Sequence, residues 1–291
     1  MGGNVIINTA LMHPRLFATV MTFEPVILKN PHQTTSLAAY PITFRRDQWP
    51  SREAALNSFH KHPTYKTWTP EVLKLFIEYG LRDLPTLLYP NVPKDAPQSV
   101  TLTTTKYQEA LSFLRAAYPP DRSTPLSEWV PTQTKYPDIG DANWRDLNDP
   151  FYRPEMTHTF SQIPYLRPSC LFLYGKNTML MPAKFKRAEK TSTCGTGLGG
   201  SGGVAAGRVE ERELEGGGHY FPLEKPVMLA DDVLGPWLDK EIGRWIEETR
   251  VEKKAWETAE KPKRSQYDQD WEWWMKKVNP MKPTKPMRAK I

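Results

Sequence analysis

The sequence predicts an α/β fold with parallel strands, and three observations support this prediction. Residues 17–23, 169–174 and 208–214 have strand length and are rich in β-branched, aromatic or alternating apolar residues. Segments with apolar residues at helical spacing separate these strand candidates. A glycine triplet at 216–218 follows the last strand candidate, and such a loop can place a side chain at a strand's carboxyl end, where α/β sites lie.

The first two elements are a helix and a strand. Residues 3–16 carry apolar side chains at helical spacing, and Pro14 ends the run because proline cannot continue a helix. Residues 17–23 form the first strand candidate, which stops at Glu24 and Pro25 because proline cannot donate to a sheet ladder.

A segment rich in proline and tryptophan follows, from about residue 41 to residue 164. Three stretches in it have helical patterns, so the segment reads as a helical insertion: 51–60, 70–79 and 105–117. Its aromatic residues are expected to pack a small core of their own, and in a lid they would also line an apolar acyl pocket.

The last third returns to the α/β pattern. Residues 169–174 are a continuous apolar run, which suits a parallel strand buried on both faces. A helix candidate at 183–191 and a glycine-rich loop at 195–203 precede the strand candidate at 208–214. Residues 227–249 form a closing helical region with an apolar face.

Composition argues against several classes of protein. The chain has 291 residues with no apolar run of 18 or more, so no membrane span is expected, and no basic region precedes the apolar start as in a signal peptide. Two cysteines, Cys170 and Cys194, suit a reducing compartment. The net charge of +6 reflects six Lys and Arg within the last sixteen residues, so we expect no nucleic-acid partner.

The opening residues resemble the second half of a nucleophile elbow. In the motif Gly-x-Ser-x-Gly the serine lies on a sharp strand-to-helix turn, and glycines let neighbouring backbone pass close by. Residues 1–4 read Met-Gly-Gly-Asn, so Met1 would follow the nucleophile and its backbone N–H would be one oxyanion-hole donor. The nucleophile itself would precede Met1. We therefore expect no nucleophile in the chain and no acyl-enzyme chemistry from these 291 residues alone.

The order of elbow, strand, long insertion, two strands and a histidine resembles that of an α/β-hydrolase. The chain is similar to the C-terminal two thirds of fungal α/β-hydrolases, namely the peroxisomal toxin-biosynthesis hydrolases and the acyl-CoA hydrolase of mycophenolic acid biosynthesis. The resemblance covers roughly residues 1–250 and implies a truncation just after the nucleophile serine. It rests on five segments: residues 1–4, 23–26, 45–52, 195–203 and 218–224.

The resemblance implies the C-terminal part of an α/β-hydrolase fold, with three parallel strands left and a helical lid insertion. Residues 1–40 would form a partial hydrolase core, 41–164 the helical lid, 165–250 the rest of the core with the catalytic-type histidine, and 251–291 a charged, disordered tail. The strand at 17–23 would then be an exposed edge, so we expect poor solubility or partial molten character.

His219 and Glu24 are the candidate catalytic residues. His219 would act as general base toward a hydroxyl and then as general acid toward the leaving group. In many α/β-hydrolases the acid follows the strand that ends here at Gly175, but residues 176–179 read Lys-Asn-Thr-Met. Glu24 lies at the end of the preceding strand, where the resemblance places the subgroup's acid, more often an aspartate. It would hold the histidine tautomer.

Two other motifs invite a cofactor or metal interpretation. The glycine-rich loop at 195–203 lacks the preceding strand and following helix of a dinucleotide site. It would be a floppy connection or, as a sharper alternative, would touch the phosphate or pantetheine part of a thioester substrate. His60 and His62 have no accompanying cluster with metal-site spacing. We therefore expect no cofactor and no metal.

The C-terminal residues Ala289, Lys290 and Ile291 are a conservative variant of the peroxisomal address Ser-Lys-Leu, which an import receptor reads. This predicts location in the peroxisomal matrix, otherwise in the cytoplasm, with the import receptor as a partner.

The resemblance implies a parent enzyme without a cofactor that hydrolyses an ester or an acyl-CoA thioester in fungal secondary metabolism. One alternative is a truncated, non-catalytic isoform that serves as a binding or scaffold module. Another is an epoxide-hydrolase-like protein with an aspartate nucleophile, and Met1 argues against it because that class more often has tryptophan after the nucleophile.

Overall fold

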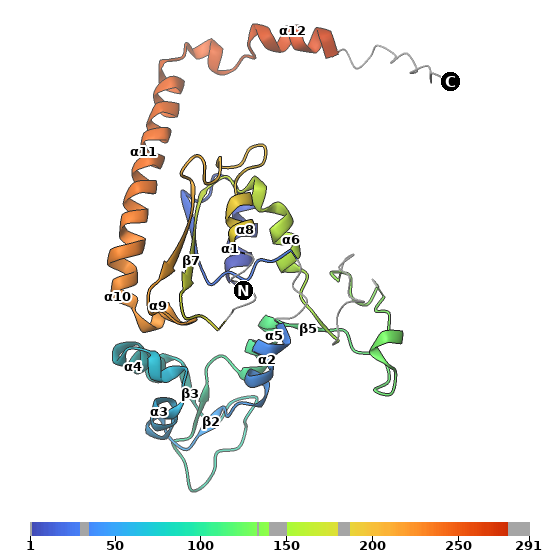
Figure 1. Cartoon of the computed structure of the whole chain (residues 1–291), viewed down its shortest axis with the longest axis vertical. Helices are drawn as coiled ribbons and strands as arrows, with labels where there is room; N and C mark the ends of the chain where they lie inside the picture. Colours follow the sequence, from blue (N-terminus) through green and yellow to red (C-terminus); the bar gives the residue numbers. More distant parts are fainter. Residues whose placement is uncertain (1, 30–34, 133, 140–149, 180–186, 279–291) are drawn as a thin grey trace. The chain divides into compact units, whose positions relative to one another are not determined.

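The computed structural model describes residues 2–29, 35–132, 134–139, 150–179 and 187–278 (Figure 1). The chain divides into two compact units, Met1–Glu241 and Ile242–Ile291. The first unit contains the central sheet and the insertion.

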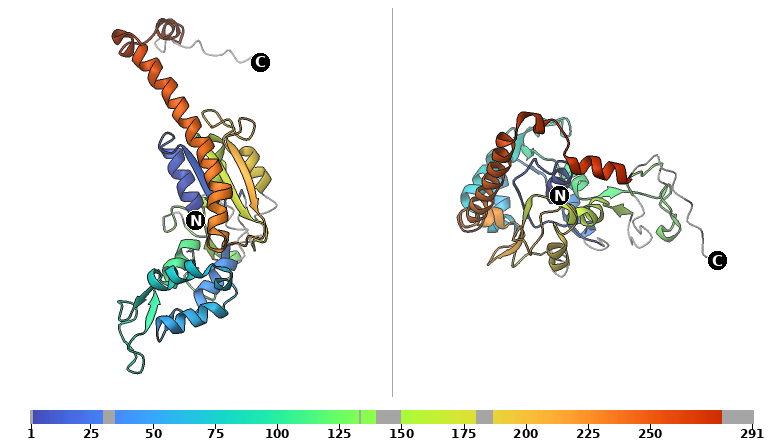
Figure 2. Two further views of the ribbon diagram at one scale, coloured as in Figure 1. Left: turned by 90° about the vertical axis from the view of Figure 1, so that its left-hand side faces the viewer. Right: turned by 90° about the horizontal axis from the view of Figure 1, so that it is seen from above.

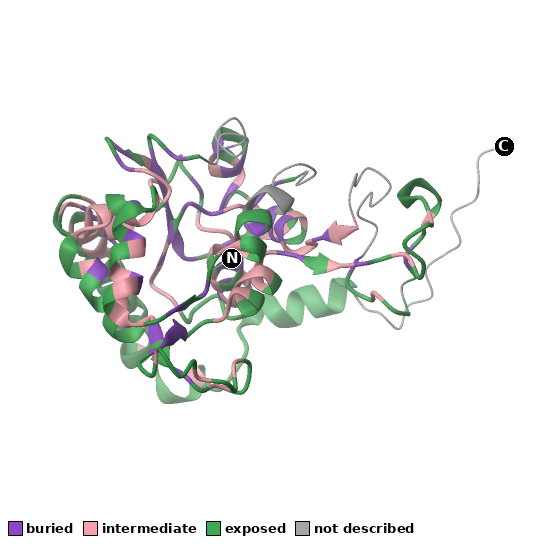
Figure 3. Ribbon diagram, turned by 90° about the horizontal axis from the view of Figure 1, so that it is seen from below, coloured by how far each residue is buried: buried purple, intermediate pink, exposed green. Residues whose placement is uncertain are grey.

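The core of the first unit is a parallel sheet of three strands, as the sequence predicts. They are β1 (Thr19–Phe23), β7 (Ser169–Gly175) and β8 (Val209–Leu214), in the order β1-β7-β8. All seven residues of the middle strand β7 are buried (Figure 3). The strand is covered on both faces, which explains why its sequence is continuously apolar rather than alternating.

Helices cover both faces of this sheet (Figures 1 and 2). On one face, Phe172 and Tyr174 of β7 pack with residues of α1 (Gly2–Met12) and α6 (Glu155–Gln162), next to α8 (Arg187–Thr193). On the other face, Leu171 and Leu173 pack with the segment that follows β8. Successive side chains of β7 face opposite sides of the sheet because a strand has a period of two residues. The segment after β8 comprises α9 (Phe221–Glu224), α10 (Pro226–Met228), the π-helix η5 (Leu229–Leu234) and the start of α11 (Gly235–Thr258).

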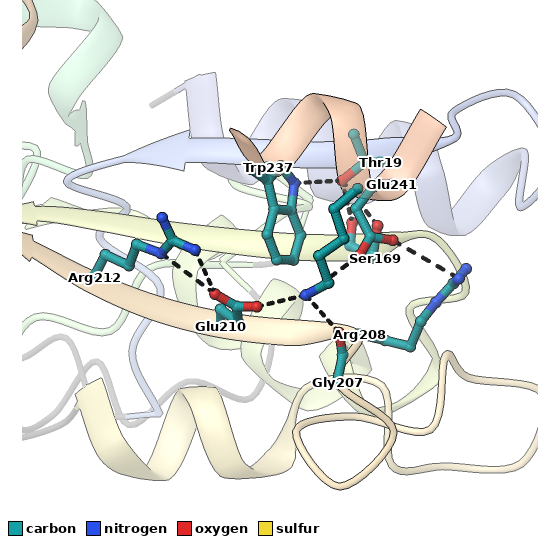
Figure 4. Close-up of polar contacts among 9 residues, drawn as sticks. Thr19, Ser169, Gly207, Arg208, Glu210, Arg212, Trp237 and Glu241 are labelled. Carbon is teal, nitrogen blue, oxygen red and sulfur yellow. Dashed lines mark hydrogen bonds and ion pairs between the residues drawn. The ribbon is translucent and has the colours of Figure 1, made fainter. Parts of the chain in front are cut away.

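Polar contacts at the amino ends of the strands tie the first turns of α11 to the sheet (Figure 4). The indole N–H of the fully buried Trp237 donates to Thr19 Oγ1 at 2.9 Å, and the Ser169 hydroxyl donates to the same oxygen at 2.9 Å. The buried Glu241 lies 3.7 Å from Arg208. The two hydrogen bonds to Thr19 satisfy polar groups that would otherwise be costly to bury, and the ion pair offsets part of the cost of burying the Glu241 charge.

The insertion between β1 and β7 has its own core and contains helices as predicted, together with short strands that the prediction did not include. Helices α3 (Arg52–Lys61) and α4 (Pro70–Tyr79) match two predicted helices, and Ser51 and Thr69 cap their first turns. Alongside them lies an antiparallel sheet in the order β2-β4-β3. Its strands have only two or three residues, too few for an alternating pattern to be recognised. They are β2 (Gln48–Trp49), β3 (Leu81–Asp83) and β4 (Val100–Leu102).

Further elements lie in the described part of the insertion. They are α2 (Thr35–Phe44), η1 (Tyr65–Thr67), α5 (Lys106–Phe113), β5 (Arg115–Ala116), η2 (Leu126–Glu128), β6 (Phe151–Tyr152) and η4 (Ile163–Tyr165). Buried residues around Trp49 and Phe59 form the insertion's own core, with Tyr65 and Trp68 packed against it.

The second unit differs from the disordered tail that the composition predicts. Helix α11 continues to Thr258, and η6 (Lys261–Arg264) and α12 (Gln269–Val278) follow. Glutamate and lysine are good helix formers, and pairs such as Lys253 with Glu257 support a helix at this spacing. The last thirteen residues lie outside the described part. None of the helices that are described combines the length and the apolar character needed to cross a bilayer.

Candidate active site

The structure brings Glu24 and His219 together at the carboxyl edge of the central sheet. Glu24 directly follows β1, and His219 lies five residues after the end of β8. His219 Nδ1 is 3.4 Å from Glu24 Oε2 although 195 residues separate the two in sequence. The distance is at the long end for a hydrogen bond, as is common for catalytic pairs without substrate. The glutamate side chain is 5% exposed and the imidazole 25% exposed.

Glu24 occupies a strained backbone conformation. Its φ is +47°, the left-handed region that residues other than glycine seldom adopt. Its N–H still continues the sheet by donating to the carbonyl of Leu173 at 2.8 Å. Strain of this kind costs on the order of 1 kcal/mol and is concentrated at functional sites. The turn directs the carboxylate across the end of β7 toward the histidine loop.

Two donors besides the imidazole hold the Glu24 carboxylate. The Gly175 N–H donates to Oε1 at 2.6 Å, and the Thr178 hydroxyl donates to Oε2 at 2.8 Å. Thr178 lies in the 176–179 turn, where many α/β-hydrolases carry the acid, and no sequence pattern pointed to its hydroxyl. Its hydroxyl instead supports the carboxylate that comes from β1. With both oxygens engaged, the rotamer of Glu24 is fixed toward His219.

Close backbone packing positions the histidine loop. The Asn177 N–H donates to the carbonyl of Gly217 at 2.9 Å, which links the loop to the turn after β7. A Cβ added to Gly175 would lie 2.1 Å from the carbonyl oxygen of Gly218, so only glycine fits there. His219 packs edge-on against Tyr220, with ring centroids 4.9 Å apart.

No family model matches the chain, but known proteins resemble it in sequence and in fold. It is 36% identical over 262 residues to the type I acyl-CoA thioesterase mpaH of Penicillium roqueforti, which covers 84% of this chain and 58% of that protein. It is 25% identical over 242 residues to the abhydrolase domain-containing protein AFT2-1 of Alternaria alternata, covering 83% of this chain and 81% of that protein. The peroxisomal α/β-hydrolase Lpx1 of Saccharomyces cerevisiae matches with a TM-score of 0.50 and 12% identity, covering 94% of this chain and 58% of Lpx1.

This chain has an α/β-hydrolase fold. It is homologous to fungal hydrolases of that fold, and it spans just under three fifths of the length of the acyl-CoA thioesterase it matches. In the α/β-hydrolase arrangement, the carboxyl edge that carries Glu24 and His219 is the edge where catalytic side chains gather.

A buried lysine supports the Glu24 turn of this hydrolase fold from beneath. Lys190 of α8 is 1% exposed, and its ammonium donates to the carbonyl of Pro25 at 2.8 Å. It also lies over the rings of Phe172 and Tyr174, at 5.3 and 5.1 Å. Burial lowers the pKa of Lys190 from 10.5 to about 8. The sequence gives no sign of this role, because Lys190 looks like an ordinary charged residue on a helix.

The lowered pKa of Lys190 makes the stability of the fold depend on pH. Between pH 8 and 10.5 the unfolded chain holds a proton on this lysine that the folded chain has released, so stability rises with pH in that window. The stabilisation from the neutral Lys190 is fully present above pH 10.5, and it is lost as the pH falls from 10.5 to 8. From pH 8 to pH 10 we expect a gain of about 2 kcal/mol from this group.

The measurement is urea unfolding at pH 8, 9 and 10 for the unmodified chain and for Lys190→Met. The difference in unfolding free energy between the two should shift by that amount across the series. A difference that stays constant with pH would contradict the assignment to Lys190. Lys253→Met, at an exposed ion pair of α11, is the matched control and should leave the pH dependence unchanged.

Backbone hydrogen bonds tie the glycine-rich loop at 195–203 to the segment before β7, and the loop lies at the opposite edge of the sheet from the candidate site. The N–H groups of Gly195, Gly197 and Ser201 donate to carbonyls of residues 163, 164 and 166 at 2.7 to 2.9 Å. Because the loop leads into the start of β8, it lies at the amino ends of the strands. This placement contradicts the expectation that it touches the phosphate or pantetheine part of a substrate bound at His219.

The structure leaves the other candidates away from this site or undescribed. Met1, the expected oxyanion-hole donor, and the C-terminal residues Ala289 to Ile291 lie outside the described residues. His60 and His62 are both exposed on the insertion. Across the described ranges, no three or more His, Cys, Asp or Glu residues gather as metal ligands would.

Proposed function

We propose that the protein is a hydrolase that cleaves an acyl-CoA thioester or a related ester, with Glu24 and His219 as the acid–base pair. The observation that carries the proposal is the 3.4 Å contact between these two side chains at the carboxyl edge of the sheet. The substrate class comes from the homologous thioesterase of Penicillium roqueforti. Fungal secondary metabolism is the proposed setting.

The proposed chemistry is acyl transfer through a serine ester. His219 Nε2 takes the proton of a serine hydroxyl while the oxygen bonds to the acyl carbon, and the thiolate that leaves accepts that proton from the imidazolium. Water then attacks the acyl-enzyme by the same proton route. Glu24 keeps the Nδ1–H tautomer and stabilises the imidazolium. We propose that the serine and the second oxyanion-hole donor come from outside these 291 residues, with the backbone N–H of Met1 as the first donor.

The experiment that tests this proposal uses the protein isolated from its own cells. Intact mass and N-terminal peptide mapping come first, followed by release of free thiol from a panel of acyl-CoA esters. We expect a mass above 33.5 kDa, a Gly-x-Ser peptide ahead of Met1, and thiol release. A mass of 33.5 kDa without turnover would overturn the proposal and favour a non-catalytic binding or scaffold module.

We also propose that the protein is imported into peroxisomes through Ala289, Lys290 and Ile291. A fluorescent protein that carries residues 279–291 at its C-terminus should co-localise with a peroxisomal marker in fungal cells. Lys290→Glu in the same fusion should return it to the cytoplasm, because the receptor reads a basic residue at this position. A diffuse signal from the unmodified fusion would contradict this proposal.

A further inference from the structure

One carboxylate joins the histidine loop to the insertion. Glu224 Oε2 accepts a hydrogen bond from the Gly218 N–H at 2.7 Å. The Thr67 hydroxyl lies 3.1 Å from Glu224 Oε1 and 2.9 Å from the carbonyl oxygen of Thr64, so these two acceptors share its single proton. Gly218 directly precedes His219. Thr67 ends η1 of the insertion. The two oxygens of a single side chain therefore bind the backbone beside the candidate catalytic histidine and the segment that would cover it.

Two further contacts join the same two segments. The Thr69 N–H donates to the carbonyl of Leu223 at 3.1 Å. The rings of Trp68 and Tyr220 lie 6.2 Å apart. Residues 67–69 thus meet residues 220–224 through a backbone bond, an aromatic contact and the Glu224 carboxylate. We call this set of contacts between residues 67–69 and residues 220–224 the seam.

The positions of Glu224 and Gly218 in the sequence allow the carboxylate to reach the backbone N–H. Glu224 is the last residue of α9, the single helical turn that follows His219, and its side chain folds back past the start of that turn. A Cβ on Gly218 would lie 2.8 Å from Glu224 Oε1, so glycine lets the carboxylate approach the backbone. A carboxylate can accept from two donors at once with full charge assistance, which a hydroxyl or an amide cannot match.

We propose that Glu224 is a positioning residue that couples docking of the insertion segment at residues 64–69 to the orientation of His219. With that segment docked, both oxygens are engaged and the Gly218 N–H is held, which sets the loop that aims the imidazole at Glu24. When the segment lifts, Glu224 loses the Thr67 hydroxyl and the histidine loop loosens. The catalytic consequence rests on the proposed function, whereas the coupling itself is a property of the fold.

Hydrogen exchange of backbone amides, followed by mass spectrometry on the 291-residue chain, tests the coupling without any activity. Thr67→Val removes the hydroxyl but keeps the side-chain volume. We expect it to speed exchange about tenfold in the peptide that contains residues 216–221, although Thr67 makes no bond to that peptide's backbone. Glu224→Gln should speed exchange in that peptide and in the peptide that contains residues 64–69.

Three controls make the result decisive. Thr67→Ser restores a hydroxyl and should restore slow exchange in residues 216–221. Glu215→Gln removes an exposed partner of Lys176 in the turn after β8 and should change neither peptide. The peptide that contains β7 reports global unfolding and should be unaffected in every variant. Faster exchange confined to residues 64–69 in Thr67→Val would overturn the coupling.

A kinetic measurement then separates this inference from the proposed function. If the isolated protein releases thiol from acyl-CoA, Thr67→Val should lower kcat about tenfold with little change in KM, and Thr67→Ser should recover kcat. An equal rise in KM with kcat unchanged would assign the seam to substrate binding and overturn the positioning role. If no turnover is found but exchange is coupled, the proposed function fails and the coupling stands.

Discussion

Replacing His219 with alanine should abolish thioester cleavage while substrate binding survives. The variant lacks the imidazole that contacts the Glu24 carboxylate, and the ammonium of Lys190 is engaged with the carbonyl of Pro25, so the proton of the nucleophile loses its acceptor. We expect kcat/KM to fall by on the order of 10⁵-fold. The measurement is thiol release by the isolated protein, with binding of a non-hydrolysable acyl-CoA analogue followed by calorimetry. The control is His60→Ala, which replaces an exposed histidine of the insertion and should leave kcat/KM unchanged.

Glu24→Gln should cost less, about 10⁴-fold, because the shape of the site survives but the tautomer of His219 is no longer fixed. The glutamine oxygen can still accept from only one of its present donors, the Gly175 N–H or the Thr178 hydroxyl. Because the Gly175 N–H can only donate, the oxygen is expected to stay on it. The amide nitrogen then takes the place of Oε2, where its N–H group faces His219 Nδ1 and favours the wrong tautomer. Full activity in Glu24→Gln would show that the orienting acid lies elsewhere. Retained turnover in His219→Ala would exclude the acid–base pair altogether.

Replacing Gly175 with alanine should have the largest effect on the fold. The new methyl group would meet the carbonyl oxygen of Gly218 at 2.1 Å, where backbone rather than a flexible side chain must move. The end of β7 and the histidine loop would separate, with loss of the Asn177–Gly217 bond. The Gly175 N–H bond to Glu24 would weaken at the same time. We expect a loss of about 3 kcal/mol in the free energy of unfolding.

Chemical unfolding of the purified chain measures this loss. Gly243→Ala is the matched control, because a Cβ there meets open space on helix α11. That substitution should stabilise the helix by roughly 0.5–1 kcal/mol, since alanine has the higher helix propensity. A Gly175→Ala variant that is as stable as the unmodified chain would show that the histidine loop does not pack against β7 in this way.

Local patterns predicted much of the core. The three strands appear at the expected places, because a buried parallel strand requires a continuous apolar run and β7 has one. Helix α4 has the predicted bounds, since the Thr69 cap and Pro70 fix its start. The strand-end positions of Glu24 and His219 also follow from sequence order, because parallel strands all end at the same edge.

The short strands of the insertion and the helices after residue 251 were not predicted, and each omission has a physical reason. The strands β2, β3 and β4 are too short to show a period, so the sequence predicted only the helices of the insertion. The segment from 251 to 278 was expected to be disordered from its charge, yet the same glutamates and lysines form the pairs that favour a helix. Composition alone cannot distinguish a solvated helix from a disordered segment.

By itself, the sequence determined the strands and the order of the elements, because those depend on local period and chain order, and the resemblance to fungal α/β-hydrolases singled out Glu24 and His219 as candidates. Only the tertiary structure shows which contacts position Glu24 and His219. The hydroxyl of Thr178 and the buried ammonium of Lys190 bind the left-handed turn at Glu24 and Pro25 from positions more than 150 residues away in sequence. Contacts of that kind arise when the chain folds, so no local pattern in the residues reveals them.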